Sequence, residues 1–179
     1  EETINEMTWL CNQPDTIFIG QSVAYPGNAL YGTLSGVPME KRLELPVAEE
    51  LQMGMSIGLA LTGKTVISIY PRFDFLLLAM NQLVNHLDKL EEFTHGQYQA
   101  KVIIRVGIGS TSPLDPGVQH CGDYTEAFTS MLKHVKAFKL FISGAILPFY
   151  QDAYKGEGSS LIVEDMNLYK EGRRTNESR

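Results

Sequence analysis

A single glutamate at the start of an uncharged helical stretch is the residue best placed to do chemistry in this chain. Glu49 ends the segment Leu45-Pro46-Val47-Ala48-Glu49, and no ionisable side chain occurs from Leu51 to Thr62. We expect the helix that begins here to be buried on most sides. Because apolar surroundings raise the pKa of a carboxyl group, Glu49 could stay protonated enough at neutral pH to donate a proton.

A structural role for Glu49 is the alternative. A carboxylate in the first helical turn offsets the helix dipole, which is worth roughly a few tenths of a kcal/mol. Glu50 follows directly, and only one of the two can point outward from a helix that is buried on most sides. Gly54 and Gly58 leave a small-residue face on which another backbone can approach closely, either within the chain or across a subunit contact.

Two phenylalanines and one histidine are the other candidates. Phe73 and Phe75 follow a predicted strand, and each suits either the apolar core or a stacking platform for a planar heterocycle. Arg72 and Asp74 are consistent with paired surface charges at a helix start. His120 lies in a loop rich in glycine and proline, where a histidine is often merely solvated, but a pKa near neutrality suits it to proton transfer.

The sequence does not favour cysteine or metal chemistry. Cys121 follows His120, but neighbouring side chains on an extended loop diverge, and no other ligand cluster is near in sequence. Cys11 is far from Cys121, and the two give neither a disulfide framework nor a zinc spacing, which favours a reducing, cytoplasmic setting. The remaining histidines are expected on the surface: His86, His95 and His134.

Composition excludes several classes of function. The 179 residues carry a net charge of −6 and offer no stripe of lysine or arginine, so we expect no nucleic-acid partner. No apolar run approaches the roughly 20 residues that span a bilayer, and no signal peptide is recognisable, so we expect no membrane contact. With 44% hydrophobic residues, the chain can bury one sizeable core.

Apolar runs rich in β-branched residues alternate with helical patterns along the chain. Such runs are typical of parallel strands covered on both faces, and the alternation predicts an α/β fold with a doubly wound, mostly parallel sheet flanked by helices. The expected strands are residues 16–20, 65–70, 101–106, 137–142 and 160–163. The expected helices are residues 2–11, 48–62, 75–90, 124–133 and 147–154.

One α/β domain is expected over residues 1–170, followed by a polar, disordered tail over 171–179. Two loops, 21–40 and 107–123, are longer and richer in glycine and proline than a simple connection requires. Both follow strands, so they should emerge at the carboxyl edge of the sheet, where open α/β sheets bind ligands. The second loop carries His120.

Taken together, these motifs resemble the pyrimidine-binding domain of thiamine-diphosphate enzymes. The most similar variety is the beta subunit of the first component of the 2-oxo acid dehydrogenase complexes, also called the transketolase central region. Pro46-Val47-Ala48-Glu49 resembles the family's proline–aliphatic–small–glutamate motif, and Gln119-His120 resembles its catalytic-loop histidine. The other matching segments are 16–20, 24–27, the glycines 54, 58 and 63, 74–75, 81–85 and 164–169. The resemblance covers nearly all of residues 5–170.

By that resemblance, Glu49 would hydrogen-bond the aminopyrimidine ring of thiamine diphosphate and lend the proton that favours its imino tautomer. Phe75 would stack on the pyrimidine, Val47 would line its pocket, and His120 would face the substrate. The implied protein is a dehydrogenase beta-like subunit that takes part in decarboxylation of a 2-oxo acid and acyl transfer. A transketolase-like subunit that transfers a two-carbon unit, and a non-catalytic assembly module that keeps the fold, are the alternatives.

Three departures from the family pattern add further expectations. Gln21-Ser22 stands where the family carries an acidic pair, and the sequence after His120 is altered. The resemblance stops before the family's third domain, and the sequence contains no Gly-Asp-Gly followed by an asparagine for the diphosphate and magnesium. We therefore expect a second chain to bind Mg²⁺ and the diphosphate, the two chains to form a heterotetramer, and this chain alone to be inactive.

Overall fold

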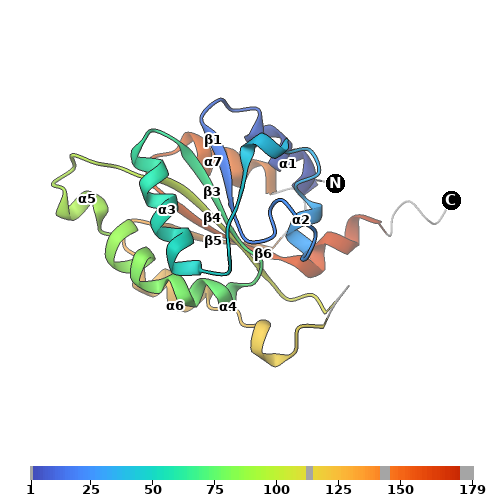
Figure 1. Ribbon diagram of the computed structural model, residues 1–179. Coiled ribbons are helices and arrows are strands. Elements are labelled where there is room, and N and C mark those ends of the chain that lie inside the picture. Colours follow the sequence, from blue (N-terminus) through green and yellow to red (C-terminus); the bar gives the residue numbers. More distant parts are fainter. Residues whose placement is uncertain (1, 112–114, 142–145, 174–179) are drawn as a thin grey trace.

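A single parallel sheet organises the chain. The computed structural model describes residues 2–111, 115–141 and 146–173 (Figure 1). Six strands, all parallel, lie in the order β2-β1-β3-β4-β6-β5. They are β1 (Thr16–Gly20), β2 (Arg42–Glu44), β3 (Thr65–Tyr70), β4 (Lys101–Ile108), β5 (Lys136–Leu140) and β6 (Ser160–Asp165). The predicted α/β fold with a parallel sheet is confirmed.

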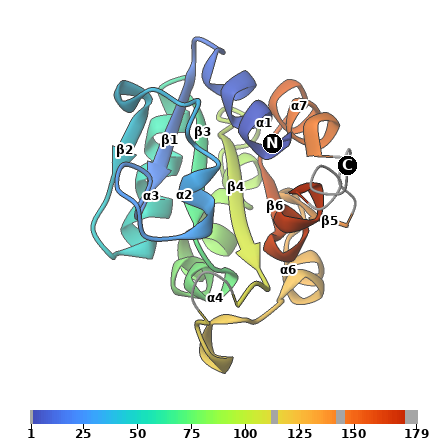
Figure 2. The same ribbon diagram turned by 90° about the vertical axis from the view of Figure 1, so that its right-hand side faces the viewer.

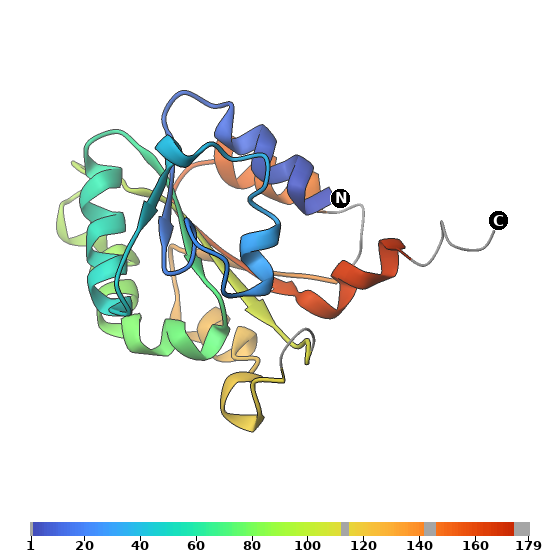
Figure 3. The ribbon, with the colours of Figure 1, turned by 45° about the vertical axis from the view of Figure 1, so that its right-hand side comes forward.

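Helices cover both faces of the sheet (Figures 2 and 3). One face, called here the α1 face, carries α1 (Glu2–Cys11), α2 (Ala29–Gly32), α7 (Ile146–Lys155) and the 3-10 helix η5 (Met166–Arg173). The other, called the α3 face, carries α3 (Glu49–Leu61), α4 (Phe73–Leu76), the 3-10 turn η2 (Leu77–Ala79), the π-helix η3 (Asn81–Leu87), α5 (Leu90–Phe93) and α6 (Thr125–Met131). Two further 3-10 turns are η1 (Met39–Lys41) and η4 (Val118–His120).

Two cores form because successive strand residues point to opposite faces. In β4, Val102 and Ile104 pack in the core of the α3 face, whereas Ile103 packs in that of the α1 face. Both faces are covered, which is why the strand sequences are continuous apolar runs rather than alternating ones.

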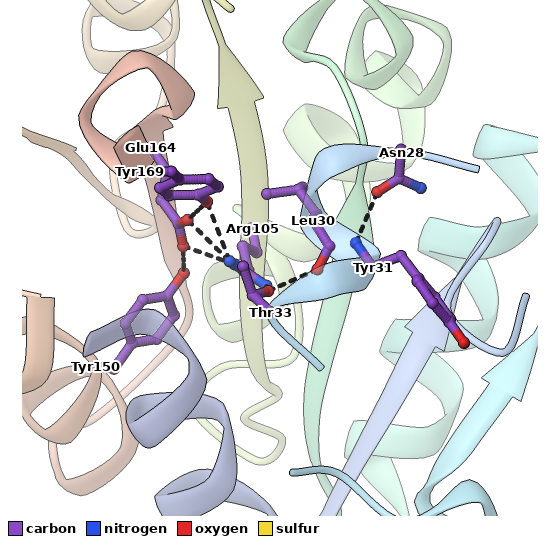
Figure 4. Close-up of polar contacts among 8 residues, drawn as sticks. All are labelled: Asn28, Leu30, Tyr31, Thr33, Arg105, Tyr150, Glu164 and Tyr169. Carbon is purple, nitrogen blue, oxygen red and sulfur yellow. Dashed lines mark hydrogen bonds and ion pairs between the residues drawn. The ribbon is translucent and has the colours of Figure 1, made fainter. Parts of the chain in front are cut away.

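One charged residue interrupts the apolar run of β4. Arg105 points to the α1 face, where its guanidinium pairs with the Glu164 carboxylate of β6 at 2.6 Å and donates to the Thr33 hydroxyl at 2.8 Å (Figure 4). The hydroxyls of Tyr150 and Tyr169 donate to the same carboxylate. This cluster ties β4 and β6 to α2, α7 and η5 inside the core.

The chain order reverses between β1 and β3 in the sheet. From β1 the chain moves outward to β2 and then returns across β1 to form β3, so the segments after β1 and β3 diverge. Ligands of open α/β sheets bind at such a reversal, outside the carboxyl ends of the strands. The segments that follow β1, β2, β3 and β4 all begin at this edge.

Several elements differ from the sequence-based expectation. The short edge strand β2 was not expected, because its sequence Arg-Leu-Glu has neither length nor an apolar run. The helix expected over 75–90 begins at Phe73 and passes from α to 3-10 to π geometry. Helix η5 reaches Arg173, so residues 171–173 of the expected tail are helical, whereas 174–179 lie outside the described residues. Residue 142, expected in a strand, also lies outside them.

None of the helices in the described ranges is long and apolar enough to cross a membrane.

Candidate active site

Glu49 is the inward-facing member of the glutamate pair. It is the first residue of α3 and 8% exposed, whereas Glu50 faces solvent, as expected for two adjacent carboxylates. The hydroxyl of Tyr70, at the end of β3, donates to the Glu49 backbone carbonyl at 3.3 Å and so ties the helix start to the sheet. Among the described residues, no group donates a hydrogen bond to the Glu49 carboxylate. Its oxygens are therefore open to a ligand.

A buried polar chain fixes the orientation of α3. The Gln52 side-chain amide donates to the Ser68 hydroxyl at 3.1 Å and to the Ile69 carbonyl at 3.0 Å. The Ser56 hydroxyl donates to the Gln52 backbone carbonyl at 2.8 Å and accepts from the Ser68 hydroxyl at 3.0 Å. A satisfied network of this kind holds one arrangement of helix on sheet. Gln52 and Ser56 lie one turn apart in an uncharged helix, and this spacing is the sequence signal for the network. The network was not predicted from the sequence.

Helix α3 is buried along one face only. The expectation that it is buried on most sides is wrong, because Leu51 is 51% exposed on the outer face and Gly58 borders open space. The absence of charge therefore reflects an apolar surface as well as a core. Beside Glu49 lies an open hollow of about 770 Å³. Its lining residues are Ala48, Glu49, Glu50, Leu51, Gly54, Met55, Leu78 and Gln82.

A second hollow continues this surface toward α5. It measures about 410 Å³ and shares Gly54 and Gln82 with the first. Large apolar side chains border the two hollows, including Leu78, which is 63% exposed, and Phe93, which is 54% exposed. The α3 apolar surface is defined here as Leu51, Gly54, Gly58, Leu61, Leu78, Phe93 and Tyr98. Apolar groups gathered in this way typically mark a protein-interaction or ligand-binding site.

Phe75 and His120 lie against each other. Their ring centroids are 5.1 Å apart at an interplanar angle of 58°, and both residues are half-buried. The His120 Nδ1 atom is buried and has no hydrogen-bond partner among the described residues. Buried side-chain nitrogens usually have a hydrogen-bond partner, so the missing partner makes His120 a candidate functional residue.

The two phenylalanines have different environments. Phe73 is completely buried and packs against Phe128, with ring centroids 4.9 Å apart, so it belongs to the core. Phe75 keeps part of its ring exposed beside His120. Leu78 and Gln82 follow Phe75 in the chain and line the hollow at Glu49. The structure therefore brings Phe75 and His120 together and places Glu49 beside the segment that follows Phe75.

Arg72 and Asp74 do not pair with each other. The Arg72 guanidinium donates to the backbone carbonyls of Gly109 and Ser110 after β4. The Asp74 carboxylate accepts hydrogen bonds farther along the same loop. The interpretation of these residues as paired surface charges is wrong, because each is bound to backbone or side chain of the loop that carries His120.

Val47 and the remaining histidines complete the candidates. Val47 is 70% exposed and is not among the residues that line the hollow at Glu49, so its part in a cofactor pocket stays a prediction. His86, His95 and His134 are exposed, as expected. Within the described ranges, no group of three or more histidine, cysteine, aspartate or glutamate side chains is placed to hold a metal ion. Both cysteines are free thiols.

Comparison with known proteins finds sequence relatives of one kind. No family model matches the chain. It is 32% identical to the pyruvate dehydrogenase E1 component subunit beta of Gracilaria tenuistipitata var. liui over 114 residues, which are 59% of this chain and 32% of that protein. The chain thus spans about a third of the length of this curated relative.

Solved structures agree on the fold. A split gene transketolase, solved as an inactive beta4 tetramer, superposes with a TM-score of 0.70 at 16% identity, covering 91% of this chain and 49% of that one. The thiamine diphosphate-dependent 4-hydroxybenzoylformate decarboxylase of Rhodococcus jostii RHA1 gives a TM-score of 0.66 at 15% identity, covering 92% and 30%. The resemblance inferred from the motifs is thereby confirmed: the chain is a homologue of pyruvate dehydrogenase E1 beta subunits and has the fold of thiamine-diphosphate-dependent enzymes.

Proposed function

We propose that this chain is one subunit of a split thiamine-diphosphate-dependent enzyme that decarboxylates a 2-oxo acid and transfers the acyl group. One observation carries the proposal. The Glu49 carboxylate is nearly buried and accepts no hydrogen bond from the described residues, yet it borders an open hollow near the carboxyl edge of a parallel sheet. A carboxylate that is purely structural would be paired or fully solvated.

The residues present fit the pyrimidine end of the cofactor. Glu49 would hydrogen-bond the pyrimidine nitrogen, because its carboxylate borders the hollow and accepts no hydrogen bond from the described residues. Phe75 would offer its exposed ring face for stacking, and Val47 would cover the outer edge of the heterocycle. When bound, thiamine diphosphate supplies the carbon centre that takes up electrons from the cleaved carbon–carbon bond of the substrate.

His120 is the proposed group on the substrate side. Its imidazole ring lies against Phe75, so a substrate next to the stacked ring would come close to it. An imidazole there could hydrogen-bond the carboxylate or carbonyl oxygen of a 2-oxo acid.

A partner chain completes the proposal. The part of the chain that the structure describes offers no cluster of metal-ligating side chains, and the α3 apolar surface faces solvent beside Glu49. A second chain packed on this surface would bring Mg²⁺ and the diphosphate site next to the pyrimidine site, and two such pairs would form a heterotetramer. This chain alone would be inactive, and the expected cytoplasmic location stays a prediction.

The test is cofactor binding with and without a partner. Calorimetry should detect thiamine diphosphate binding, dependent on Mg²⁺, only when the chain is mixed with a partner that supplies the diphosphate motif, and the mixture should consume a 2-oxo acid. Tight, Mg²⁺-dependent binding to the isolated chain would overturn the split arrangement.

A transketolase-like subunit is the second candidate, favoured by the likeness to the split gene transketolase. The same mixture supplied with a ketose donor and an aldehyde acceptor separates the two functions, because only a transketolase-like enzyme would form a ketose longer by two carbons. A mixture that binds cofactor and turns over neither substrate class would favour the non-catalytic assembly module.

A further inference from the structure

Asp74 connects the segment of Phe75 to the loop of His120. One oxygen of the Asp74 carboxylate accepts the backbone N–H of Gly122 at 3.3 Å, and the other accepts the hydroxyl of Tyr124 at 3.0 Å. The bond from the hydroxyl raises the pKa of Tyr124 above its ordinary value. Asp74 thus precedes Phe75 by one residue and binds groups two and four residues after His120.

The helix α4, which carries Asp74, is firmly packed on the core. Phe73, its neighbour in α4, is completely buried and packs against Phe128 and, edge to face, against Tyr124 at a centroid distance of 5.6 Å. A Cβ atom on Gly122 would lie 2.3 Å from the Tyr124 hydroxyl, so only glycine fits there without movement. The turn that follows His120 is therefore closely packed on the Asp74 carboxylate.

Arg72 binds the start of the loop that leads from β4 to His120. Its guanidinium donates to the carbonyl of Ser110 at 3.1 Å and to that of Gly109. Both residues adopt left-handed backbone angles, with φ of 56° at Ser110, a conformation that costs a non-glycine residue roughly 1 kcal/mol or more. The Ser110 N–H also donates to the Asn167 side chain at 3.0 Å. Arg72 and Asn167 together therefore fix the backbone of the loop where it leaves β4.

We propose that Asp74 is a positioning residue: through Gly122 and Tyr124 it holds the His120 imidazole against Phe75. Without the carboxylate, the turn after His120 loses both hydrogen bonds and the imidazole is free to leave the aromatic ring. The positioning is a property of this chain alone, and it rests on the proposed function only for what His120 does to a substrate.

Histidine NMR on the full-length chain tests the positioning. The ring protons of His120, assigned by their absence in His120→Gln, should be displaced by the ring current of Phe75 and should move in Phe75→Leu. In Asp74→Ala they should move to the same shifts, and Phe75→Leu added to Asp74→Ala should change them no further. A His120 signal unmoved in a folded Asp74→Ala chain would overturn the proposal.

Asp123→Asn is the matched control. Asp123 lies in the same turn, but its carboxylate binds Lys139 at 2.5 Å and the Thr125 N–H at 3.0 Å instead of the segment of Phe75. We expect it to leave the His120 signal in place. Tyr124→Phe removes one of the two Asp74 bonds and should give a smaller displacement. An equal displacement in Asp123→Asn and Asp74→Ala would show a general loosening of the loop and would count against Asp74.

Kinetics of the assembled enzyme provide a second readout. Asp74→Ala should lower kcat about 10-fold or more with thiamine diphosphate affinity unchanged, since positioning of a proton-transfer group acts on the chemical step. If the wild-type assembly has no cofactor-dependent activity, the proposed function fails, while the NMR comparison still decides whether Asp74 positions His120.

Discussion

Two sets of polar side chains, one on each face of the sheet, differ in how completely they are paired. On the α1 face, Arg105 and Glu164 are completely buried and joined by two contacts, at 2.6 and 2.8 Å. Three hydroxyl groups complete the cluster (Figure 4). Burial alone would raise the pKa of Glu164, but the guanidinium and these hydrogen bonds hold it below its ordinary value. Nothing in the cluster is left for a ligand.

On the α3 face, two polar groups are unpaired near an open surface, although the Gln52, Ser56 and Ser68 side chains are paired. The carboxylate of Glu49 accepts no hydrogen bond from the described residues, and Nδ1 of His120 has no partner there. An unpaired buried polar group costs free energy, so its persistence calls for an explanation. Burial of charge therefore does not by itself mark a functional site, whereas incomplete pairing next to accessible space makes a group a candidate for one.

The largest expected effect is on the closed cluster. Replacing Arg105 by Met leaves the buried Glu164 carboxylate without its counter-ion, which should lower the free energy of unfolding by about 3–5 kcal/mol. Urea denaturation measures this loss in the free energy of unfolding. The double variant Arg105→Met with Glu164→Leu should lose less than the single variant, because no buried charge remains. If the free energy of unfolding of Arg105→Met were within about 1 kcal/mol of wild type, the cluster would behave like a surface ion pair and not like a buried one.

Glu49→Gln should affect activity and leave stability nearly unchanged. Gln keeps the size of the side chain but cannot exchange a proton, so turnover of the assembled enzyme should fall by roughly 10²-fold or more. Glu50→Gln is the control, since this exposed carboxylate is worth only a few tenths of a kcal/mol at the helix start. Equal behaviour of the two variants would make Glu49 structural and remove the contrast between the faces.

Glu6 lies on the α1 face but, unlike Glu164, has no partner there among the described residues. Its burial predicts that the stability of the fold depends on pH. Its side chain is completely buried, both carboxyl oxygens lack a partner among the described residues, and burial raises its pKa to about 8. The folded chain therefore holds this proton more tightly than the unfolded chain, whose pKa is near 4.5. The resulting stability is fully present below pH 4.5 and is lost as the pH rises to about 8.

Urea unfolding of Glu6→Gln against wild type checks this. Gln cannot ionise, so the variant should gain roughly 1–3 kcal/mol on wild type between pH 5 and pH 9, the scale of an unpartnered buried polar group. Parallel pH curves for the two proteins would show that Glu6 is charged or solvated in the folded state.

The smallest effect concerns the α3 apolar surface. Gly58→Ala should stabilise the isolated chain by about 0.5–1 kcal/mol, because alanine favours helix and the added methyl group meets open space. The same variant should weaken binding of the partner chain if a backbone packs there. Gly63→Ala is the contrast, since its φ of 88° should make alanine destabilising. Unchanged partner affinity in Gly58→Ala would place the contact elsewhere.

Much of the fold follows from local sequence, whereas the site depends on long-range pairing. The strand at Thr16–Gly20 and the helix at Glu2–Cys11 were expected with the bounds that the structure has, because their apolar patterns are strong. Arg105 was expected only as part of a strand. Its partner Glu164 is 59 residues away in the sequence. The two meet because Arg105 lies opposite Ile162 in the β4–β6 register, and Glu164, two residues further along β6, points to the same face.

The same limit applies to the candidate site. The inward orientation of Glu49 relative to Glu50 could be predicted from adjacency on one helix. The role of Asp74 could not, since nothing near it in sequence reveals that Gly122 and Tyr124, about 50 residues later, supply its hydrogen bonds. Spacing identifies groups that can react, whereas the folded chain decides which other groups hold them.

The strand order has a consequence for the synthesis of the chain. Strand β6 lies between β4 and β5, so β5 has no neighbour in the sheet until residues 160–165 have been made. A nascent chain that has not yet released β6 from the ribosome therefore exposes the edge of β4 and leaves β5 unpaired. Unpaired strand edges are templates for aggregation. Strand β6 closes the sheet from within, and until it is available the two unpaired strands are the part of the nascent chain most open to aggregation.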